Sequence, residues 1–121
     1  MRVKELRWAA LKIFNAAVRA VDPREAIRCH VTREGSHLYL GHERLDLAAV
    51  GQVVVVGCGK AAAPMASAVE EILGDRIARG VVVTKYGHVQ PTRLVCVHEA
   101  GHPIPDEGGV TGAQLILDHV R

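Results

Sequence analysis

The sequence predicts an α/β fold in which helices flank a parallel sheet. Valine-rich runs at residues 53–56 and 81–83 are typical of strands that are covered on both faces. A helical pattern of apolar residues separates the two runs, and a third apolar run and another helix follow. This order favours a sheet wound by right-handed crossovers. The 121 residues, 49% of them hydrophobic, suffice for one domain with a modest core.

The N-terminal third is predicted to hold two helices and a hairpin. Apolar residues recur at helical spacing over residues 3–21, which predicts an amphipathic helix. Asp22 and Pro23 provide an N-cap and a first helical residue, so a short connecting helix is expected as far as Ile27. Weak alternation over residues 29–40 predicts two short strands.

The remaining elements alternate between strand and helix. The valine strand leads into a glycine turn, and the apolar stripe after the turn predicts a helix that ends at Gly74. Strands are expected over 80–84 and 94–98, and a last helix from near Val110. Ligands of such sheets bind beyond the carboxyl ends of the strands, so three loops are expected to meet there. These loops are residues 57–60, 85–88 and 99–109.

The glycine turn carries the strongest functional signal. A helix N-terminus gathers unpaired N–H groups and attracts anions. Gly57 and Gly59 would let a ligand approach the backbone, and Lys60 adds a mobile positive charge. These residues are therefore candidates for a phosphate or carboxylate site. The alternative is a purely structural turn that joins a strand to a helix.

Two familiar phosphate motifs do not fit this turn. A P-loop needs a glycine five residues before the Gly-Lys pair and a Ser or Thr after it, and the chain has Val54 and Ala61 there. The glycine fingerprint of dinucleotide-binding folds is present in part, but Lys85 stands where an acidic residue would bind the ribose of the cofactor. A nicotinamide cofactor is therefore not expected.

The third loop is rich in proline, glycine and ionisable side chains. His102 and Asp106 within it could bind a hydroxyl or carboxylate group, or transfer a proton. The alternative is structural: Asp106 would cap the following helix and His102 would only hydrogen-bond the loop.

Composition excludes several classes of protein. A net charge of +2 without a basic stripe argues against nucleic-acid binding, and no apolar run approaches the ~20 residues of a membrane span. Three scattered cysteines form neither a disulfide framework nor a zinc site, which fits a reducing cytoplasm. Cys58 and Cys96 are expected to pack as small residues, with a reactive thiol at Cys58 as the alternative. No metal site is predicted from the chain's own residues.

Three motifs, in this order, resemble a known family. The motifs are Gly57-Cys58-Gly59-Lys60-Ala61-Ala62-Ala63-Pro64-Met65, the run 80–88 (GVVVTKYGH) and the run 101–110 (GHPIPDEGGV). They are similar to the N-terminal, DUF4147-type domain of the glycerate 2-kinases, also called the MOFRL-associated family and formerly labelled hydroxypyruvate reductases. The resemblance covers nearly the whole chain.

The resemblance implies a Rossmann-like domain and an activity. Members would phosphorylate D-glycerate at its 2-hydroxyl with ATP and Mg²⁺ in a cleft between this domain and a C-terminal domain. Lys60 matches the family's Gly-Lys-Ala lysine and would neutralise phosphoryl charge as the catalytic residue. His102 and Asp106 match the His-Pro-x-Pro-Asp motif and would shape the glycerate site. Lys85 and His88 are further candidates for its lining.

The family's enzymes are several hundred residues long, so residues 1–121 are expected to be the N-terminal part of such an enzyme. The C-terminal domain and a later Gly/Ser-rich loop would lie beyond Arg121, and we expect the isolated chain to be inactive. An exposed sheet edge would favour self-association, for example a homodimer. The alternative is a non-catalytic module for small-anion binding or assembly, and a reductase is opposed by the missing acidic residue.

Overall fold

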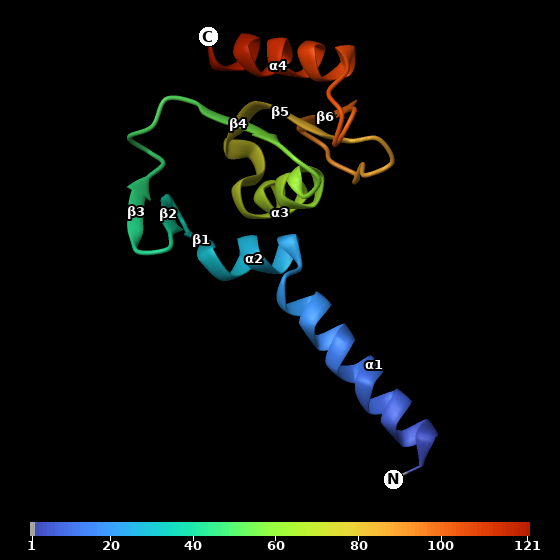
Figure 1. Cartoon of the computed structure of the whole chain (residues 1–121). Coiled ribbons are helices and arrows are strands. Elements are labelled where there is room, and N and C mark those ends of the chain that lie inside the picture. The colour runs from blue at the N-terminus through green and yellow to red at the C-terminus, as the bar shows by residue number, and fades with distance from the viewer. Residues whose placement is uncertain (1) are drawn as a thin grey trace.

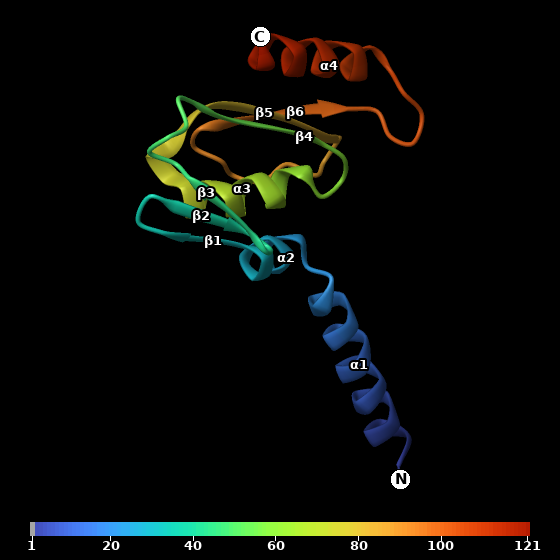
Figure 2. The same cartoon turned by 90° about the vertical axis from the view of Figure 1, so that its left-hand side faces the viewer.

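The computed structural model describes residues 2–121. Figures 1 and 2 show a parallel sheet with α4 on one face and α3 on the other; α2 and a small antiparallel sheet lie beyond α3, and α1 projects away from them. In chain order the elements are α1 (Val3–Ala20), α2 (Pro23–His30), β1 (Val31–Glu34), β2 (His37–Leu40), β3 (Glu43–Asp46), β4 (Val53–Cys58), α3 (Ala62–Leu73), the 3₁₀ turn η1 (Gly74–Arg76), β5 (Ile77–Lys85), β6 (Val95–Ala100) and α4 (Glu107–Val120).

The predicted α/β architecture is confirmed. The parallel sheet has the order β4-β5-β6, and helix α3 connects β4 to β5. The central strand β5 is buried from Gly80 to Thr84. Within residues 2–121, strand β4 pairs only with β5 and forms an edge of the sheet. Its valine run is only partly covered, and Val56 is 41% exposed. The expectation of two covered faces therefore holds for β5 and is wrong for β4.

Helix α4 packs on the sheet through a glycine. A Cβ atom added at Gly112 would lie 2.6 Å from Cγ2 of Val83 and 3.1 Å from Cδ2 of His98. These separations are shorter than van der Waals contact, so only a glycine lets the helix approach β5 and β6 this closely. The helix begins after Asp106, three residues earlier than the predicted start near Val110.

The small antiparallel sheet has one strand more than the two predicted. Strands β1, β2 and β3 pair in sequence order. All four residues of β3 are exposed. The strand therefore lacks the alternation of apolar and polar residues by which a half-buried strand is recognised in a sequence. Leu38 of β2 and Leu47 after β3 are buried with Leu73 and Ile77, and this cluster joins the small sheet to the α/β layers.

Helix α2 is more than a connection. The Asp22 carboxylate accepts hydrogen bonds from the N–H groups of Arg24 and Glu25, as expected of an N-cap, but the helix runs to His30 instead of Ile27. Arg28 lies 2.7 Å from Glu71 of α3 and 2.6 Å from Glu25, so an ion-pair network links the two helices. The hydrogen bond from Arg28 lowers the pKa of Glu71 below its ordinary range.

Glu70 at the end of α3 fixes the start of β6. Its carboxylate accepts hydrogen bonds from the backbone N–H groups of Arg93, Leu94 and Val95, at 2.8, 2.7 and 2.6 Å. Burial raises the pKa of Glu70, but the bonds from Arg93, Val95 and Leu94 act the other way and leave it below its ordinary value. The segment before β6 is thereby anchored to α3.

The cysteines are not packed as predicted. Cys29, Cys58 and Cys96 are free thiols, and all three are exposed. Cys96 lies on β6, the second edge strand, and Cys58 ends the edge strand β4, so neither is enclosed by neighbouring strands on both sides.

Among the described residues, 2–121, no helix is long and apolar enough to cross a membrane.

Candidate functional site

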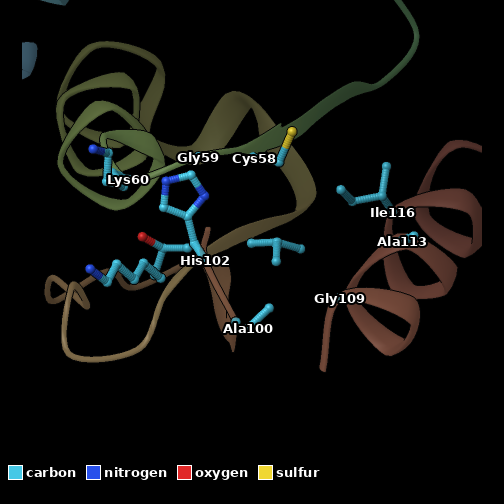
Figure 3. Close-up of a pocket in the computed structure, with 12 residues that line it drawn as sticks. Cys58, Gly59, Lys60, Ala100, His102, Gly109, Ala113 and Ile116 are labelled. Carbon is cyan, nitrogen blue, oxygen red and sulfur yellow. The ribbon is translucent and has the colours of Figure 1, made fainter. Parts of the chain in front are cut away.

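A cavity of about 330 Å³ lies at the carboxyl ends of the three parallel strands. Its walls come from the end of each strand and from one face of α4. Figure 3 shows Lys60, Gly59 and the ring of His102 close together, with Ala113 and Ile116 of α4 on the opposite side. The lining residues are Cys58–Lys60, Val83–Lys85, Ala100–His102, Gly109, Ala113 and Ile116.

The turn after β4 is held against β5. The N–H of Gly59 donates a hydrogen bond to the carbonyl of Val83 at 2.9 Å, and the carbonyl of Gly59 accepts from Ala62 at the start of α3. Gly59 has φ +123°, which other residues rarely adopt. Among residues 2–121 no side chain caps α3 at Ala61. Because the N–H of Ala62 is bonded to Gly59 and Pro64 has no N–H, the helix start offers mainly its positive dipole end next to Lys60.

The structure brings together four of the seven residues predicted for the site. Gly59, Lys60, Lys85 and His102 line the same cavity. Lys60 and His102 are exposed, and Lys85 is half-buried at the end of β5.

The other three predicted residues lie outside this lining. Gly57 borders a separate apolar groove of about 200 Å³ between β4 and the helices α2 and α3. His88 belongs to the exposed turn after β5, where its N–H donates to the carbonyl of Lys85 at 3.0 Å. Asp106 lies at the start of α4.

Asp106 has the structural role that the sequence left open as an alternative. Its carboxylate accepts hydrogen bonds from the N–H of Gly101 at 2.9 Å, the N–H of Gly109 at 3.2 Å and the hydroxyl of Tyr86 at 2.9 Å. The bonds from Gly101 and Tyr86 lower the pKa of Asp106, and the same contact with Asp106 raises the pKa of Tyr86. Asp106 thus closes the loop that carries His102 and caps α4.

A second set of hydrogen bonds joins the loops after β5 and β6. Oε1 of Glu99 accepts a hydrogen bond from the N–H of Gly87 at 2.7 Å, and the N–H of Tyr86 donates to the carbonyl of Ala100 at 3.2 Å. Gly101 is also required, because a Cβ atom there would lie 2.6 Å from the carbonyl oxygen of Ile104. The roles of Tyr86 and Glu99 are not evident from the sequence, because their partners are 20 and 12 residues away.

The cavity is suited to an anion. Two lysines and a histidine line it, and no Asp or Glu is among its lining residues. The uncapped start of α3 adds its positive dipole end. Thr84 also lines the cavity; its hydroxyl is buried and, within residues 2–121, has no hydrogen-bond partner.

Nothing in the described part of the chain makes a metal centre. No group of three or more His, Cys, Asp or Glu side chains in residues 2–121 is placed to hold a metal ion. Mg²⁺ is bound in proteins through carboxylate oxygens, and the cavity lining contains none. These residues therefore do not fit a Mg²⁺ site of their own.

The chain is similar in sequence to kinases that are much longer. It is 36% identical over 117 residues to a glycerate 2-kinase of Pyrococcus horikoshii, which covers 97% of this chain and 26% of that protein. It is also 36% identical over 118 residues to a D-glycerate 2-kinase of Thermotoga maritima, which covers 97% of this chain and 25% of that protein. The chain thus spans about a quarter of the length of the curated relatives that it matches.

A solved structure and a protein-family model agree with these similarities. The crystal structure of glycerate kinase from Thermotoga maritima matches with a TM-score of 0.69 and 33% identity, over 95% of this chain and 25% of that chain. The family model described as "Domain of unknown function (DUF4147)" matches residues 9–121. The resemblance read from the three motifs is confirmed, and the chain belongs to the DUF4147 family.

Proposed function

We propose that this chain forms one wall of the active site of an ATP-dependent glycerate 2-kinase. The observation that supports this most directly is the cavity in which Lys60, Lys85 and His102 meet beside the uncapped start of α3. The substrates are proposed from the names of the longer relatives, which are glycerate 2-kinases. We place the reaction in the cytoplasm, where the three free thiols would stay reduced.

In the proposed reaction the 2-hydroxyl oxygen of D-glycerate forms a bond to the γ-phosphorus of ATP. The bond from that phosphorus to the bridging oxygen of ADP breaks, and the hydroxyl proton is released. Phosphoryl transfer is catalysed mainly by positioning and by stabilising negative charge. Lys60 would neutralise charge on the transferred group, and Lys85 and His102 would bind oxygens of glycerate or phosphate. We assign the general base to none of these residues.

Mg²⁺ accompanies ATP in the proposed reaction and would neutralise phosphate charge. Because the cavity lining lacks carboxylates, its ligands would come from the nucleotide or from a longer polypeptide. The isolated chain is therefore proposed to bind anions without turnover.

The test compares this chain with a full-length hybrid in which it replaces the matched quarter of the Thermotoga maritima enzyme. We expect ADP release from ATP and D-glycerate only in the hybrid, and Lys60→Ala should reduce kcat at least about a hundredfold. Arg44→Ala, which removes a positive charge from β3, is the matched control and should leave kcat unchanged. Near-normal turnover of the Lys60→Ala hybrid would contradict the proposal.

A second candidate is a non-catalytic module that binds small anions, because two lysines and a histidine line the cavity and no Asp or Glu does. Inorganic phosphate or D-glycerate should then raise the melting temperature of the isolated chain, since a ligand that binds only the native state stabilises it. Stabilisation by phosphate together with an inactive hybrid would favour this module. Stabilisation by NADPH alone would favour a reductase.

A further inference from the structure

The first helix leaves a broad apolar surface uncovered. No residue of α1 is buried, although the helix has 18 residues. Val3, Leu6, Leu11, Ile13, Phe14 and Val18 are each more than half exposed. Figures 1 and 2 agree that α1 extends away from the rest of the molecule, with the N-terminus at its far end.

Most helices in proteins are stabilised by packing one apolar face rather than by helix propensity alone. In α1 that face is formed by residues spaced three and four apart, namely Val3, Leu6, Ala10, Ile13 and Ala17. Lys12 and Asn15 lie on other faces of the helix. An amphipathic helix with no covered face indicates a binding surface.

The charge of α1 restricts the choice of partner. The helix carries four basic side chains, Lys4, Arg7, Lys12 and Arg19, and one acidic side chain, Glu5. Pairing with α1 of a second copy would bring together two helices that each carry a net positive charge, which disfavours association. A complementary partner therefore presents an apolar groove flanked by acidic side chains.

The longer relatives indicate which polypeptide provides this groove. The Thermotoga maritima kinase structure aligns with 95% of this chain, so about six of the 121 residues are left out, fewer than the 18 of α1. Most of α1 is therefore matched in a protein four times as long. In that protein three quarters of the chain are available to cover the helix.

We propose that the apolar face of α1 docks into an acidic-rimmed groove on the C-terminal part of a full-length kinase of this family. This proposal rests on the proposed function for the identity of the partner, but the docking itself does not require turnover. It makes α1 the element that joins this domain to the remainder of the enzyme.

The test uses two variants that add the same charge to different faces of α1. Ile13→Asp changes the apolar face, and Asn15→Asp is the matched control outside it. In the isolated chain neither should shift the melting temperature, because the side chains of Ile13 and Asn15 are both exposed. In the full-length hybrid, Ile13→Asp should lower the melting temperature by about 4 °C or more, and Asn15→Asp should not.

Hydrogen exchange gives a second readout. Amides of residues 3–20 should exchange at least about a hundredfold more slowly in the hybrid than in the isolated chain. Equal exchange, a neutral Ile13→Asp, or a hybrid without a cooperative thermal transition would each overturn the proposal. If the hybrid is active but Ile13→Asp leaves its melting temperature unchanged, only the docking proposal is contradicted. If the hybrid is inactive but Ile13→Asp lowers its melting temperature, only the proposed kinase function is contradicted.

Two other partners are distinguished with the isolated chain. A basic amphipathic helix can also lie on an anionic membrane. Sedimentation of the chain with phosphatidylserine-containing vesicles, combined with an unprotected α1 in the hybrid, would overturn the proposal in favour of a membrane. A concentration-dependent dimer that Ile13→Asp abolishes would overturn it in favour of a second copy.

Discussion

The hydroxyl of Tyr86 donates a hydrogen bond of 2.9 Å to the carboxylate of Asp106, 20 residues further along the chain. This carboxylate also binds the N–H of Gly101, the residue before His102. Tyr86 directly follows Lys85, so the contact connects the loops that carry two residues of the candidate site. Asp106 lies outside the cavity lining and holds the two loops that border it.

Replacing Tyr86 by phenylalanine should loosen the loop that carries His102. The amides of Gly101 and Gly109, both bonded to Asp106, should exchange faster with solvent because the carboxylate loses its third partner. Tyr39→Phe on β2 is the matched control and should leave these two amides unchanged. Equal exchange in both variants would show that the tyrosine does not hold the loop.

Replacing Glu70 by glutamine should weaken the acid dependence of stability. The folded-state pKa of Glu70 lies below its ordinary value of 4.5. The contribution of Glu70 to the free energy of unfolding is therefore complete above the unfolded-state pKa. It is lost as the pH falls through the folded-state pKa.

We expect the urea midpoint of Glu70→Gln to change less than that of the wild type between about pH 6 and pH 3. The control is Glu34→Gln, an exposed position on β1, which should follow the wild type. A Glu70→Gln profile parallel to the wild type would rule out this anchor as a source of acid sensitivity.

Replacing Gly112 by alanine should destabilise the fold. The added methyl group would lie 2.6 and 2.9 Å from the two γ-carbons of Val83, and overpacking of this kind costs about 1–3 kcal/mol. Gly109→Ala in the same helix meets no atom within 4 Å and should be neutral or slightly stabilising, since alanine favours helix. Urea unfolding of both variants measures the difference; equal stability would contradict the close packing of α4.

Replacing Thr84 by valine should stabilise the isolated chain. The Thr84 side chain is 3% exposed and its hydroxyl has no partner within residues 2–121. Removing a buried unpaired hydroxyl while keeping the shape should raise the free energy of unfolding by about 1 kcal/mol. Thr111→Val on the exposed face of α4 is the control. A loss of stability at position 84 would mean that the hydroxyl has a partner in solution.

The sequence was most informative where a pattern is local. The glycine turn before α3, the stripe that ends at Gly74 and the Asp22 N-cap all depend on residues within one or two helical turns, and each is present in the structure. The meeting of three loops followed from the parallel order of the strands. Lys60, Lys85 and His102 accordingly line one cavity.

The sequence was less informative where tertiary contacts decide. Strand β3 has no buried residue, so its pairing depends on β2 and not on its own pattern. The two possible roles of Asp106 were equally compatible with the sequence, because only the fold brings Tyr86 to it. The edge position of β4, which exposes Val56, depends on which strands pair, and valine content alone does not reveal this.

The projection of α1 also decides what optical spectroscopy of this protein can report. Trp8 is the single tryptophan of the chain. It lies on α1 and is 62% exposed, and the centroid of its ring is 3.7 Å from Nζ of Lys12. Its emission would therefore remain that of a hydrated indole while the parallel sheet melts or an anion enters the cavity. Tryptophan fluorescence of the isolated chain reports on α1 alone, and circular dichroism or calorimetry is needed to follow unfolding of the two sheets and the helices packed on them.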